Sequence, residues 1–405
     1  MNYNLIIIGG GAAGVFTAIK ALEESPNIKV LLLEKGSQLL TKVRISGGGR
    51  CNVTHSCFEP KELVKRYPRG EKELVGPFHR FQPKDIIHWL EERGVPLKTE
   101  EDGRVFPTTD SSATIIDCFL GELKKRSCEI RYSSQVRKIE KGFQITLDSG
   151  ETLRSDALLL ATGSAKQGYD LAASLGHTII PPVPSLFTFN LPTSPLLDLA
   201  GIVTSNVELN VGEYRTTGPL LLTHWGFSGP AALKLSAFAA RILAEKNYHT
   251  TLTVNWVNSP YETVLKELYM KKETSPAQTL SSLLFYLPKN LWKRLLIKFG
   301  LDPEKKLADL SKASLQHLAK NLTQDSYQMD GKSTYKEEFV TAGGINKKEI
   351  HFQTMESKLC PGLYFAGEIV DIDGITGGYN FQNAWTGAYL AAKAISSTTA
   401  LKHKA

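Results

Sequence analysis

The chain has 405 residues, of which 42% are hydrophobic and 22% charged, and its formal net charge is +7. This length suits two or three domains, and the composition is that of an ordinary globular protein, which excludes a disordered or fibrous chain. The charge is small for the length, so nucleic acid is not expected as a partner.

The cysteines and the apolar stretches exclude further classes. The cysteines form no C-x-x-C pair and no cluster with histidine at metal-ligand spacing, so neither a disulfide framework nor a metal site is expected. The uncharged stretch 5–19 is too short to span a bilayer and follows no basic segment. We therefore predict neither a membrane segment nor a signal peptide, and we expect a cytoplasmic location.

The first predicted strand, residues 4–8, leads directly into a glycine-rich turn. Its apolar residues suit a parallel strand buried on both faces, and apolar residues at helical spacing follow the turn. Gly9 permits the tight turn, Gly11 lets a pyrophosphate approach the backbone, and Gly14 lets helix and strand pack closely. The predicted cofactor-binding residues of the turn are Gly9, Gly10, Gly11, Ala12, Ala13 and Gly14.

The second predicted strand, residues 29–33, is followed by Glu34 and Lys35. A carboxylate at this position accepts hydrogen bonds from both hydroxyl groups of an adenosine ribose and disfavours a 2′-phosphate. The order of strand, turn, helix, strand and acid predicts a dinucleotide site, with Glu34 and Lys35 among its residues. On this pattern alone, both FAD and NAD fit.

A second glycine-rich stretch, residues 41–52, sets three glycines beside cationic side chains. Backbone donors and charged donors together suit phosphates and the polar edge of a flavin, whereas a plain flexible loop is the alternative. Two amphipathic helices, over 83–94 and 111–126, follow as scaffold. The cofactor-binding residues predicted in the glycine-rich stretch are Lys42, Arg44, Ser46, Gly48, Gly49 and Asn52.

Short strand patterns begin at residue 129 and predict an antiparallel meander, at 136–139, 143–147 and 152–153. A fully apolar strand, residues 157–160, then ends in an Ala-Thr-Gly turn. This order is similar to the FAD-binding half of the glutathione-reductase-type flavoproteins, so FAD becomes the expected cofactor. The predicted contacts of this region are Val136, Ala161, Thr162 and Gly163.

Residues 191–335 are predicted to form an inserted α+β domain, with strands first and helices after them. Within it, the stretch 223–230 precedes a helix and places His224 in a turn that suits the lining of a substrate cavity. The segment 289–294 mixes aromatic and cationic residues. At helical spacing this pattern favours one core face and one solvated face.

Residues 336–405 are predicted to complete the FAD-binding domain that residues 1–190 begin. A short apolar strand before Gly367 puts a carboxylate and backbone amides beside the ribityl chain. The turn 374–380 opens a helix whose N-terminal amides suit the N1/C2 carbonyl edge of a flavin. The predicted contacts are Gly367, Glu368, Asp371, Gly378, Tyr379 and Asn380.

Together these motifs resemble a bacterial FAD-binding family labelled aminoacetone-oxidase-like or NAD(P)/FAD-dependent oxidoreductase. The resemblance implies an α/β fold with a discontinuous Rossmann-like FAD-binding domain, interrupted by one insert, within the two-dinucleotide-binding-domain flavoprotein superfamily. The loop after Gly163 is shorter than is usual in the family, and no second complete G-x-G-x-x-G is present. The resemblance rests on residues 9–14, 42–52, 103–107, 161–163, 223–230 and 354–383.

The expected function is an FAD-dependent oxidoreductase that transfers a hydride between flavin N5 and a small substrate held between FAD and the insert, with NAD(P)H as a candidate electron donor. Two other functions stay open. One is an RNA-interacting flavoprotein in which basic insert helices bind nucleic acid and FAD serves base modification, and the other is a redox sensor without turnover. The candidates for substrate contact or proton transfer are Arg50, Cys51, Asn52 and His224.

Overall fold

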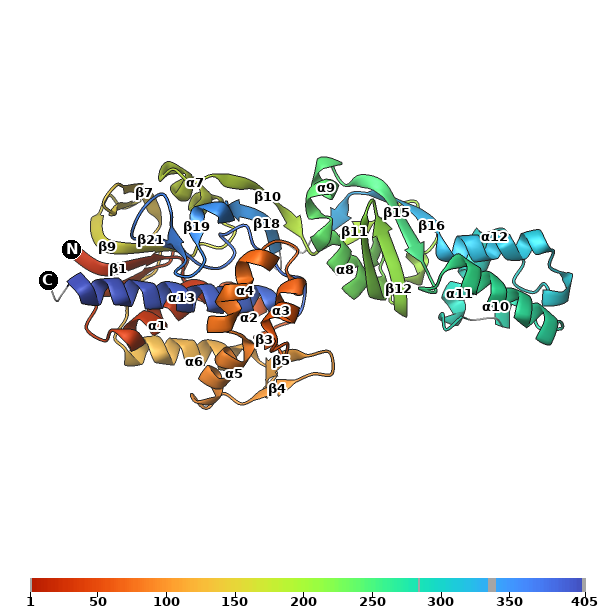
Figure 1. Cartoon of the computed structure of the whole chain (residues 1–405), viewed down its shortest axis with the longest axis horizontal. Coiled ribbons are helices and arrows are strands. Elements are labelled where there is room, and N and C mark those ends of the chain that lie inside the picture. The colour runs from red at the N-terminus through yellow and green to blue at the C-terminus, as the bar shows by residue number, and fades with distance from the viewer. Residues whose placement is uncertain (1, 283–284, 334–339, 403–405) are drawn as a thin grey trace. The chain divides into compact units, whose positions relative to one another are not determined.

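The computed structural model describes residues 2–282, 285–333 and 340–402. The chain divides into two compact units, Met1–Val183 with Lys336–Ala405 and Pro184–Tyr335 (Figure 1). Strand β11 (Thr188–Asn190) lies in the second unit, whereas the sequence analysis assigns residues up to 190 to the first. The return crossing, expected between residues 335 and 336, lies outside the described residues.

A mixed sheet forms the centre of the first unit and brings its two segments together. β1 pairs in parallel with β2 and β9, and β21 from the C-terminal segment pairs in parallel with β9. Ile8 lies opposite both Leu33 and Leu160, and Phe365 lies opposite Leu160, so these strands end at one common edge. The order is β19 (Ile350–His351), β20 (Glu356–Ser357), β21 (Leu363–Phe365), β9 (Thr152–Leu160), β1 (Asn2–Ile8), β2 (Val30–Leu33) and β6 (Glu129–Arg131).

Three helices pack together on one side of this sheet: α1 (Ala12–Glu24), α6 (Ser112–Lys125) and α13 (Tyr379–Lys402) (Figure 1). The buried ring of Phe16 on α1 meets the edge of Trp385 on α13, with ring centroids 5.6 Å apart. The helix predicted from apolar residues after the turn is thus confirmed, and its buried residues hold the N-terminal and C-terminal segments against each other.

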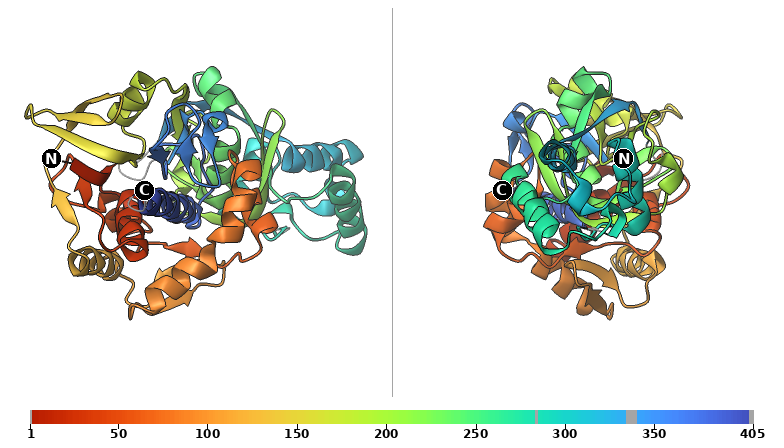
Figure 2. Two further views of the ribbon diagram at one scale, coloured as in Figure 1. Left: turned by 60° about the vertical axis from the view of Figure 1, so that its left-hand side comes forward. Right: turned by 90° about the vertical axis from the view of Figure 1, so that its right-hand side faces the viewer.

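The predicted meander is confirmed with one difference. β7 (Val136–Glu140) and β8 (Gln144–Leu147) pair antiparallel, and β8 pairs with the start of β9 (Figure 2, yellow). The sequence predicts separate strands at 152–153 and 157–160, but the structure joins them in β9. Burial alternates where β9 pairs with β8 and becomes continuous where it lies between β1 and β21, so one strand carries both patterns.

The smaller elements of the first unit connect this framework. β3, β4 and β5 form a small antiparallel sheet, and β10 pairs with β18. Their bounds are α2 (Thr41–Ile45), β3 (Thr54–His55), α3 (Pro60–Leu63), α4 (Glu71–Arg80), α5 (Pro83–Glu91), β4 (Leu97–Thr99), β5 (Arg104–Pro107), α7 (Lys166–Ser174), β10 (Ile179–Ser185) and β18 (Val340–Ile345).

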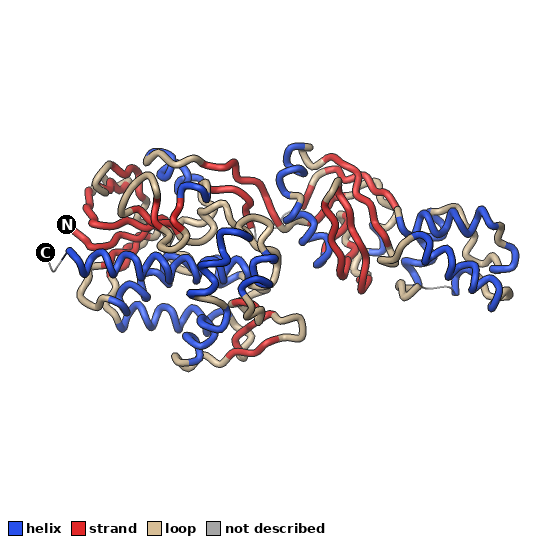
Figure 3. The backbone as a smooth tube through the Cα atoms, viewed as in Figure 1, coloured by secondary structure: helices blue, strands red, loops and turns tan. Residues whose placement is uncertain are grey.

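The second unit combines an antiparallel sheet with helices around one continuous apolar core. Figure 3 shows its sheet and the three helices α10 to α12 as separate parts of the unit. The sheet order is β16 (Asp325–Asp330), β15 (His249–Asn255), β12 (Val203–Val211), β13 (Tyr214–Leu222), β14 (Gly226–Ser228), β11 and β17 (Lys332–Ser333). The helices are α8 (Gly229–Phe238), α9 (Ala240–Glu245), α10 (Tyr261–Thr274), α11 (Lys289–Lys298) and α12 (Lys312–Thr323). Among the described helices of the whole chain, none has both the length and the apolarity that crossing a membrane requires.

Candidate functional site

The glycine-rich turn lies at the edge where β1, β2, β9 and β21 end. Gly9 has a φ of 110°, and a Cβ there would come within 2.4 Å of the Ala161 carbonyl oxygen. A Cβ at Gly14 would come within 1.9 Å of the Gly9 carbonyl oxygen, whereas one at Gly11 would meet no atom within 4 Å. The turn therefore has the expected tight bend, close packing and open position. Contact with a pyrophosphate at Gly11 stays a prediction.

Glu34 stands beside this turn, directly after β2. Its Oε2 accepts a hydrogen bond from Gly10 N at 2.8 Å, and its Oε1 accepts one from Gly36 N at 2.7 Å. The segment that leads to Val136 runs alongside, because Ser134 N donates to the Glu34 carbonyl oxygen at 2.9 Å. Val136 itself is buried in β7. The carboxylate is thus fixed beside the turn, and its contact with a ribose stays a prediction.

The Ala-Thr-Gly turn after β9 contains a buried hydroxyl group without a hydrogen-bond partner in the described part of the chain. Thr162 Oγ1 is inaccessible to solvent and has no hydrogen-bond partner among the described residues. The loop is short, since α7 begins at Lys166, and a Cβ at Gly168 would come within 1.7 Å of the threonine oxygen. The hydroxyl thus packs against Gly168 of α7, and contact of this turn with a dinucleotide stays a prediction.

Lys42 joins three segments of the first unit that are far apart in the sequence. Its Nζ lies 2.5 Å from Glu368 Oε2 and 3.4 Å from Ser164 Oγ. The other oxygen of Glu368 accepts a hydrogen bond from Thr341 N at 3.0 Å. The Lys42 side chain is 50% exposed, so its ammonium group also faces solvent. The neighbouring prediction, Lys35, is exposed.

The second glycine-rich stretch is a short helix followed by a left-handed loop. The three glycines at 47–49 have φ angles of 58°, 68° and 83°, and a Cβ at Gly48 or Gly49 would meet nothing within 4 Å. Ser112 at the start of α6 holds the loop, because its Oγ donates to the Arg44 carbonyl oxygen and its N donates to that of Gly49, each at 2.8 Å. The Ser46 carbonyl oxygen accepts from Gly49 N at 3.1 Å. The loop is thus fixed, with open space beside the two glycines predicted as contacts, although both backbone polar groups of Gly49 already have partners within the protein.

Arg50 and Cys51, two candidates for substrate contact or proton transfer, are engaged within the protein. Arg50 Nη1 lies 2.7 Å from Glu100 and 3.4 Å from Asp110, and its guanidinium carbon lies 3.9 Å from the centre of the Phe106 ring. Cys51 is fully buried, and burial raises the pKa of its thiol to about 12. Such a thiol is not ionised at neutral pH. A role of Arg50 or Cys51 in substrate contact or proton transfer stays a prediction.

Asn52 links this loop to the start of α13. In the amide orientation that satisfies both of its polar atoms, its oxygen accepts from Gly378 N at 3.0 Å and its nitrogen donates to the Thr54 carbonyl oxygen at 2.8 Å. A Cβ at Gly378 would come within 2.6 Å of the same Thr54 oxygen. Asn52 and Gly378, predicted from distant parts of the sequence, therefore meet.

Hydrogen bonds from side chains fix the first turn of α13 and the turn that precedes it. Tyr379 is buried, and its carbonyl oxygen accepts from Tyr67 OH at 2.7 Å. The Asn380 side chain closes the preceding turn, with its oxygen accepting from Gly374 N at 2.8 Å and its nitrogen donating to Gly374 O at 2.9 Å. The first amides of a helix have no partner within it, and contact of this terminus with a flavin edge stays a prediction.

The C-terminal strand of the sheet also ends beside the turn. A Cβ at Gly367, which has a φ of 78°, would come within 3.1 Å of Ala13 Cβ at the start of α1. Asp371 is buried, and its N donates to the Ile345 carbonyl oxygen at 3.0 Å. The predicted contacts from the two ends of the chain thus lie at one edge of one sheet.

His224 lies in the second unit, in the turn between β13 and β14. Thr223 Oγ1 accepts from Trp225 N at 3.3 Å and from Gly226 N at 3.1 Å, which fixes the turn. The His224 side chain is exposed, and Trp225 is 62% exposed. The sequence analysis selects the histidine but not the tryptophan, whose exposure only the structure shows.

Two further features near α13 carry no sequence signal. The His55 ring stacks on Tyr379 with centroids 4.8 Å apart, and its Nε2 lies 3.0 Å from the Asp102 carbonyl oxygen. Burial lowers the pKa of His55, which keeps the ring neutral at pH 7. Arg69 forms a buried ion pair with Asp373, across 304 residues of sequence. No cluster of three or more metal-ligand side chains occurs in the described ranges.

Comparison with known proteins places this geometry in context. The family model described as HI0933-like protein Rossmann domain matches residues 3–394. The ribosomal RNA dihydrouridine synthase of Escherichia coli K12 is 33% identical, over 97% of this chain and 98% of that protein. The 3-dehydro-bile acid delta(4,6)-reductase of Clostridium scindens is 28% identical, over 96% of this chain and 98% of that protein. Among solved structures, a 3-ketosteroid-delta4-(5alpha)-dehydrogenase from Rhodococcus jostii RHA1 aligns with a TM-score of 0.51 at 14% identity, over 98% of this chain and 97% of that one.

Proposed function

Because the chain belongs to the HI0933-like family of Rossmann-domain proteins, we propose that it reduces a carbon–carbon double bond conjugated to a carbonyl group, and that its substrate is a uridine in ribosomal RNA. One observation carries the choice of substrate. The 33% identity to the E. coli dihydrouridine synthase extends over 98% of that protein, so it covers both units of this chain.

The resemblance to FAD-binding oxidoreductases is confirmed, under a different family label. The cofactor is FAD, and the open Gly11 turn and the fixed Glu34 carboxylate fit it. When bound, FAD supplies hydride transfer at flavin N5. The rigid start of α13 would orient the ring through its free amides.

Reduction of the C5=C6 bond of uracil adds one hydride and one proton. The two electrons come from an external donor, for which we propose NAD(P)H. A uracil ring and a 3-oxo-4-ene steroid both contain a double bond conjugated to a carbonyl. The names of the two full-length relatives therefore denote one type of reaction on different substrates.

His224 and Trp225 are the proposed substrate contacts of the second unit. The fixed turn presents an imidazole, which donates or accepts hydrogen bonds near neutral pH, beside an exposed indole that offers a face for a planar ring. A planar unsaturated ring, as in uracil, suits this pair. Because the net charge is small, the sequence by itself favours a small-molecule substrate over RNA. The match to a full-length ribosomal RNA dihydrouridine synthase favours RNA instead.

A second candidate function is reduction of a free small molecule such as a 3-oxo-4-ene steroid. The observation that favours it is the 28% identity to the bile acid reductase over 98% of that protein.

The test supplies the FAD-loaded protein and NADH or NADPH with an unmodified ribosomal RNA transcript, and in parallel with a 3-oxo-4-ene steroid. The expected result is a uridine that gains two hydrogens, located by mass spectrometry of nuclease fragments. An RNA without mass change together with a saturated steroid would reject RNA as the substrate and support the second candidate. Loss of neither double bond would reject both.

A further inference from the structure

The helical part of the second unit, residues 261–323, carries most of the net positive charge of the chain. It contains 11 Lys and Arg against 6 Asp and Glu, a net charge of +5 out of +7. The sequence analysis singled out the basic segment 289–294 and predicted one core face and one solvated face. That prediction is confirmed, since the buried face of α11 consists of Leu291, Trp292, Leu295 and Leu296.

Some of these cations hold the helical part to the rest of the second unit. Arg294 pairs with Asp198 at 2.6 Å, and the partly buried Lys298 pairs with Asp325. Lys293 lies 3.7 Å from Glu304. These residues have partners within the unit and are not available to another molecule without breaking a contact.

A second set of lysines is exposed and unpaired. In the part of the chain that the structure describes, no carboxylate lies within ion-pair distance of their ammonium groups. Together with Tyr286 they define what we call the helical surface: Lys266, Lys289, Lys305, Lys306, Lys312 and Lys320. Unpaired lysines in this number form a field that attracts polyanions.

Tyr286 projects from the same part of the unit, just before α11. Its side chain is 100% exposed, while its neighbour Phe285 packs against Trp292 with ring centroids 5.8 Å apart. Both residues adopt left-handed backbone conformations, with φ angles of 40° for Phe285 and 61° for Tyr286. This conformation is unfavourable for bulky residues. It turns one ring into the core and the other out to solvent.

A protein surface that carries both an exposed aromatic ring and lysines without ion-pair partners suits single-stranded nucleotides, since bases stack on the ring and lysines neutralise phosphates. We infer that the helical surface of the second unit is an RNA-binding site, in which Tyr286 stacks on an unpaired base and the exposed lysines contact the phosphates on either side. This inference rests on the proposed function, and it names the surface that selects the RNA.

The test measures binding of the full-length protein, without reductant, to a fluorescein-labelled RNA hairpin with an unpaired uridine loop, and to a duplex of the same length. Fluorescence anisotropy is recorded from about 50 to 200 mM salt. The variants are Y286A and K289A/K305A/K306A. The matched control is K61A/K72A/K84A, which removes three exposed, unpaired lysines from the first unit.

The K289A/K305A/K306A variant should lower the slope of log Kd against the logarithm of the salt concentration by about 2. Y286A should weaken hairpin binding about ten-fold, with duplex binding and salt dependence unchanged, because stacking requires an unpaired base. The control should bind the hairpin within about two-fold of the unmodified protein. If neither variant differs from the control, or if the protein binds phosphatidylserine vesicles and not RNA, the inference is overturned.

The outcome separates this inference from the proposed function. If dihydrouridine forms and the variants bind RNA normally, the surface is wrong and the function stands. If RNA binds through this surface and no dihydrouridine forms in the transcript, the proposed reaction is wrong and the surface stands.

Discussion

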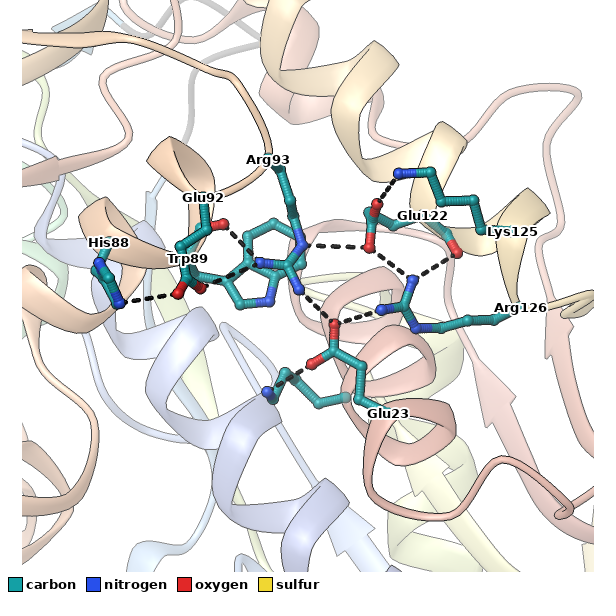
Figure 4. A network of polar contacts seen from close by, with 9 residues as sticks. Glu23, His88, Trp89, Glu92, Arg93, Glu122, Lys125 and Arg126 are labelled. Carbon is teal, nitrogen blue, oxygen red and sulfur yellow. Dashed lines mark hydrogen bonds and ion pairs between the residues drawn. The ribbon is translucent and has the colours of Figure 1, made fainter.

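The two units of the chain differ in where some of their charged and aromatic side chains are placed. In the first unit, Arg93 and Arg126 each contact both Glu23 and Glu122, at distances of 2.6 to 3.2 Å (Figure 4). The Arg93 guanidinium also lies 3.9 Å from the centre of the Trp89 ring. These charges join α1, α6 and the end of α5, and each has its partner within the unit.

In the second unit, the helical surface leaves lysines without partners, and two aromatic side chains stand in solvent, Trp225 at 62% and Tyr286 at 100% exposure. The difference indicates a division of labour. The network of the first unit fastens the C-terminal ends of α1 and α6 to each other, whereas the exposed rings and lysines of the second unit are available to a partner. The following predictions test this comparison, from the largest expected effect to the smallest.

The first prediction concerns the open position of the turn. Gly11→Ala adds a Cβ that meets no protein atom, so the fold should persist, while the methyl group blocks the pyrophosphate and lowers FAD affinity by about 100-fold or more. Flavin absorbance of the purified protein and titration with FAD measure the effect. Gly121→Ala on α6, where the added Cβ is also unobstructed, is the control and should leave FAD affinity unchanged. Normal FAD binding by the Gly11 variant would place the nucleotide elsewhere.

The charge network of the first unit should be structural. Glu122→Ala removes a nearly buried carboxylate that pairs with both Arg126 and Arg93. It should lower the free energy of unfolding by about 3 kcal/mol. Urea unfolding measures this. Glu62→Ala removes an exposed pair with Lys65 and should cost less than about 1 kcal/mol. Equal costs for the two variants would contradict a buried network.

Acid should remove the stabilisation that the Glu122 carboxylate provides. Burial by itself raises the pKa of Glu122, but hydrogen bonds from Lys125 and Arg126 outweigh it and lower the pKa to about 2 from a usual value of 4.5. A lowered pKa stabilises the folded state above pH 4.5, and this stabilisation is lost as the pH falls towards 2. The unfolding free energies of the unmodified protein and Glu122→Gln should therefore converge over this interval. A constant difference would show that folding does not lower the pKa of Glu122.

The exposed indole of the second unit should matter for substrate and not for stability. Trp225→Ala should lower kcat/KM about ten-fold, mainly through KM, while Trp225→Phe keeps part of the activity because a ring remains. The free energy of unfolding should change by less than about 0.5 kcal/mol, since the side chain is exposed. Leu359→Ala, at an exposed apolar side chain of the first unit, is the control. Unchanged kinetics would remove Trp225 from the site.

The smallest effect is expected at Cys51. Its thiol has a pKa raised to about 12 and is fully buried, so it should resist alkylation by iodoacetamide at pH 8 in the native protein, as read by mass spectrometry. Cys51→Ala should keep kcat within about two-fold and cost about 1 kcal/mol of stability. Rapid labelling, or loss of turnover in a folded variant, would restore this cysteine as a reactive group.

The sequence by itself determined the strand–turn–helix around Gly9 to Gly14, the placing of Glu34 after the second strand, and the helix that starts at Tyr379. These are local patterns, because apolar periodicity and glycine positions within a dozen residues decide them. The sequence predicted two strands where the structure has the single strand β9. The burial pattern of β9 changes along its length because its neighbouring strands change, and those strands are distant in the sequence.

Only the tertiary structure decided which side chains are enclosed and which remain open. The contact of Lys42 with Glu368 spans 326 residues, and the burial of Cys51 and the exposure of Trp225 depend on segments that meet only in the fold. A residue type and its spacing specify what chemistry is available. Burial and partners, which set pKa and reactivity, arise from contacts between distant parts of the chain, and a local pattern carries no record of them.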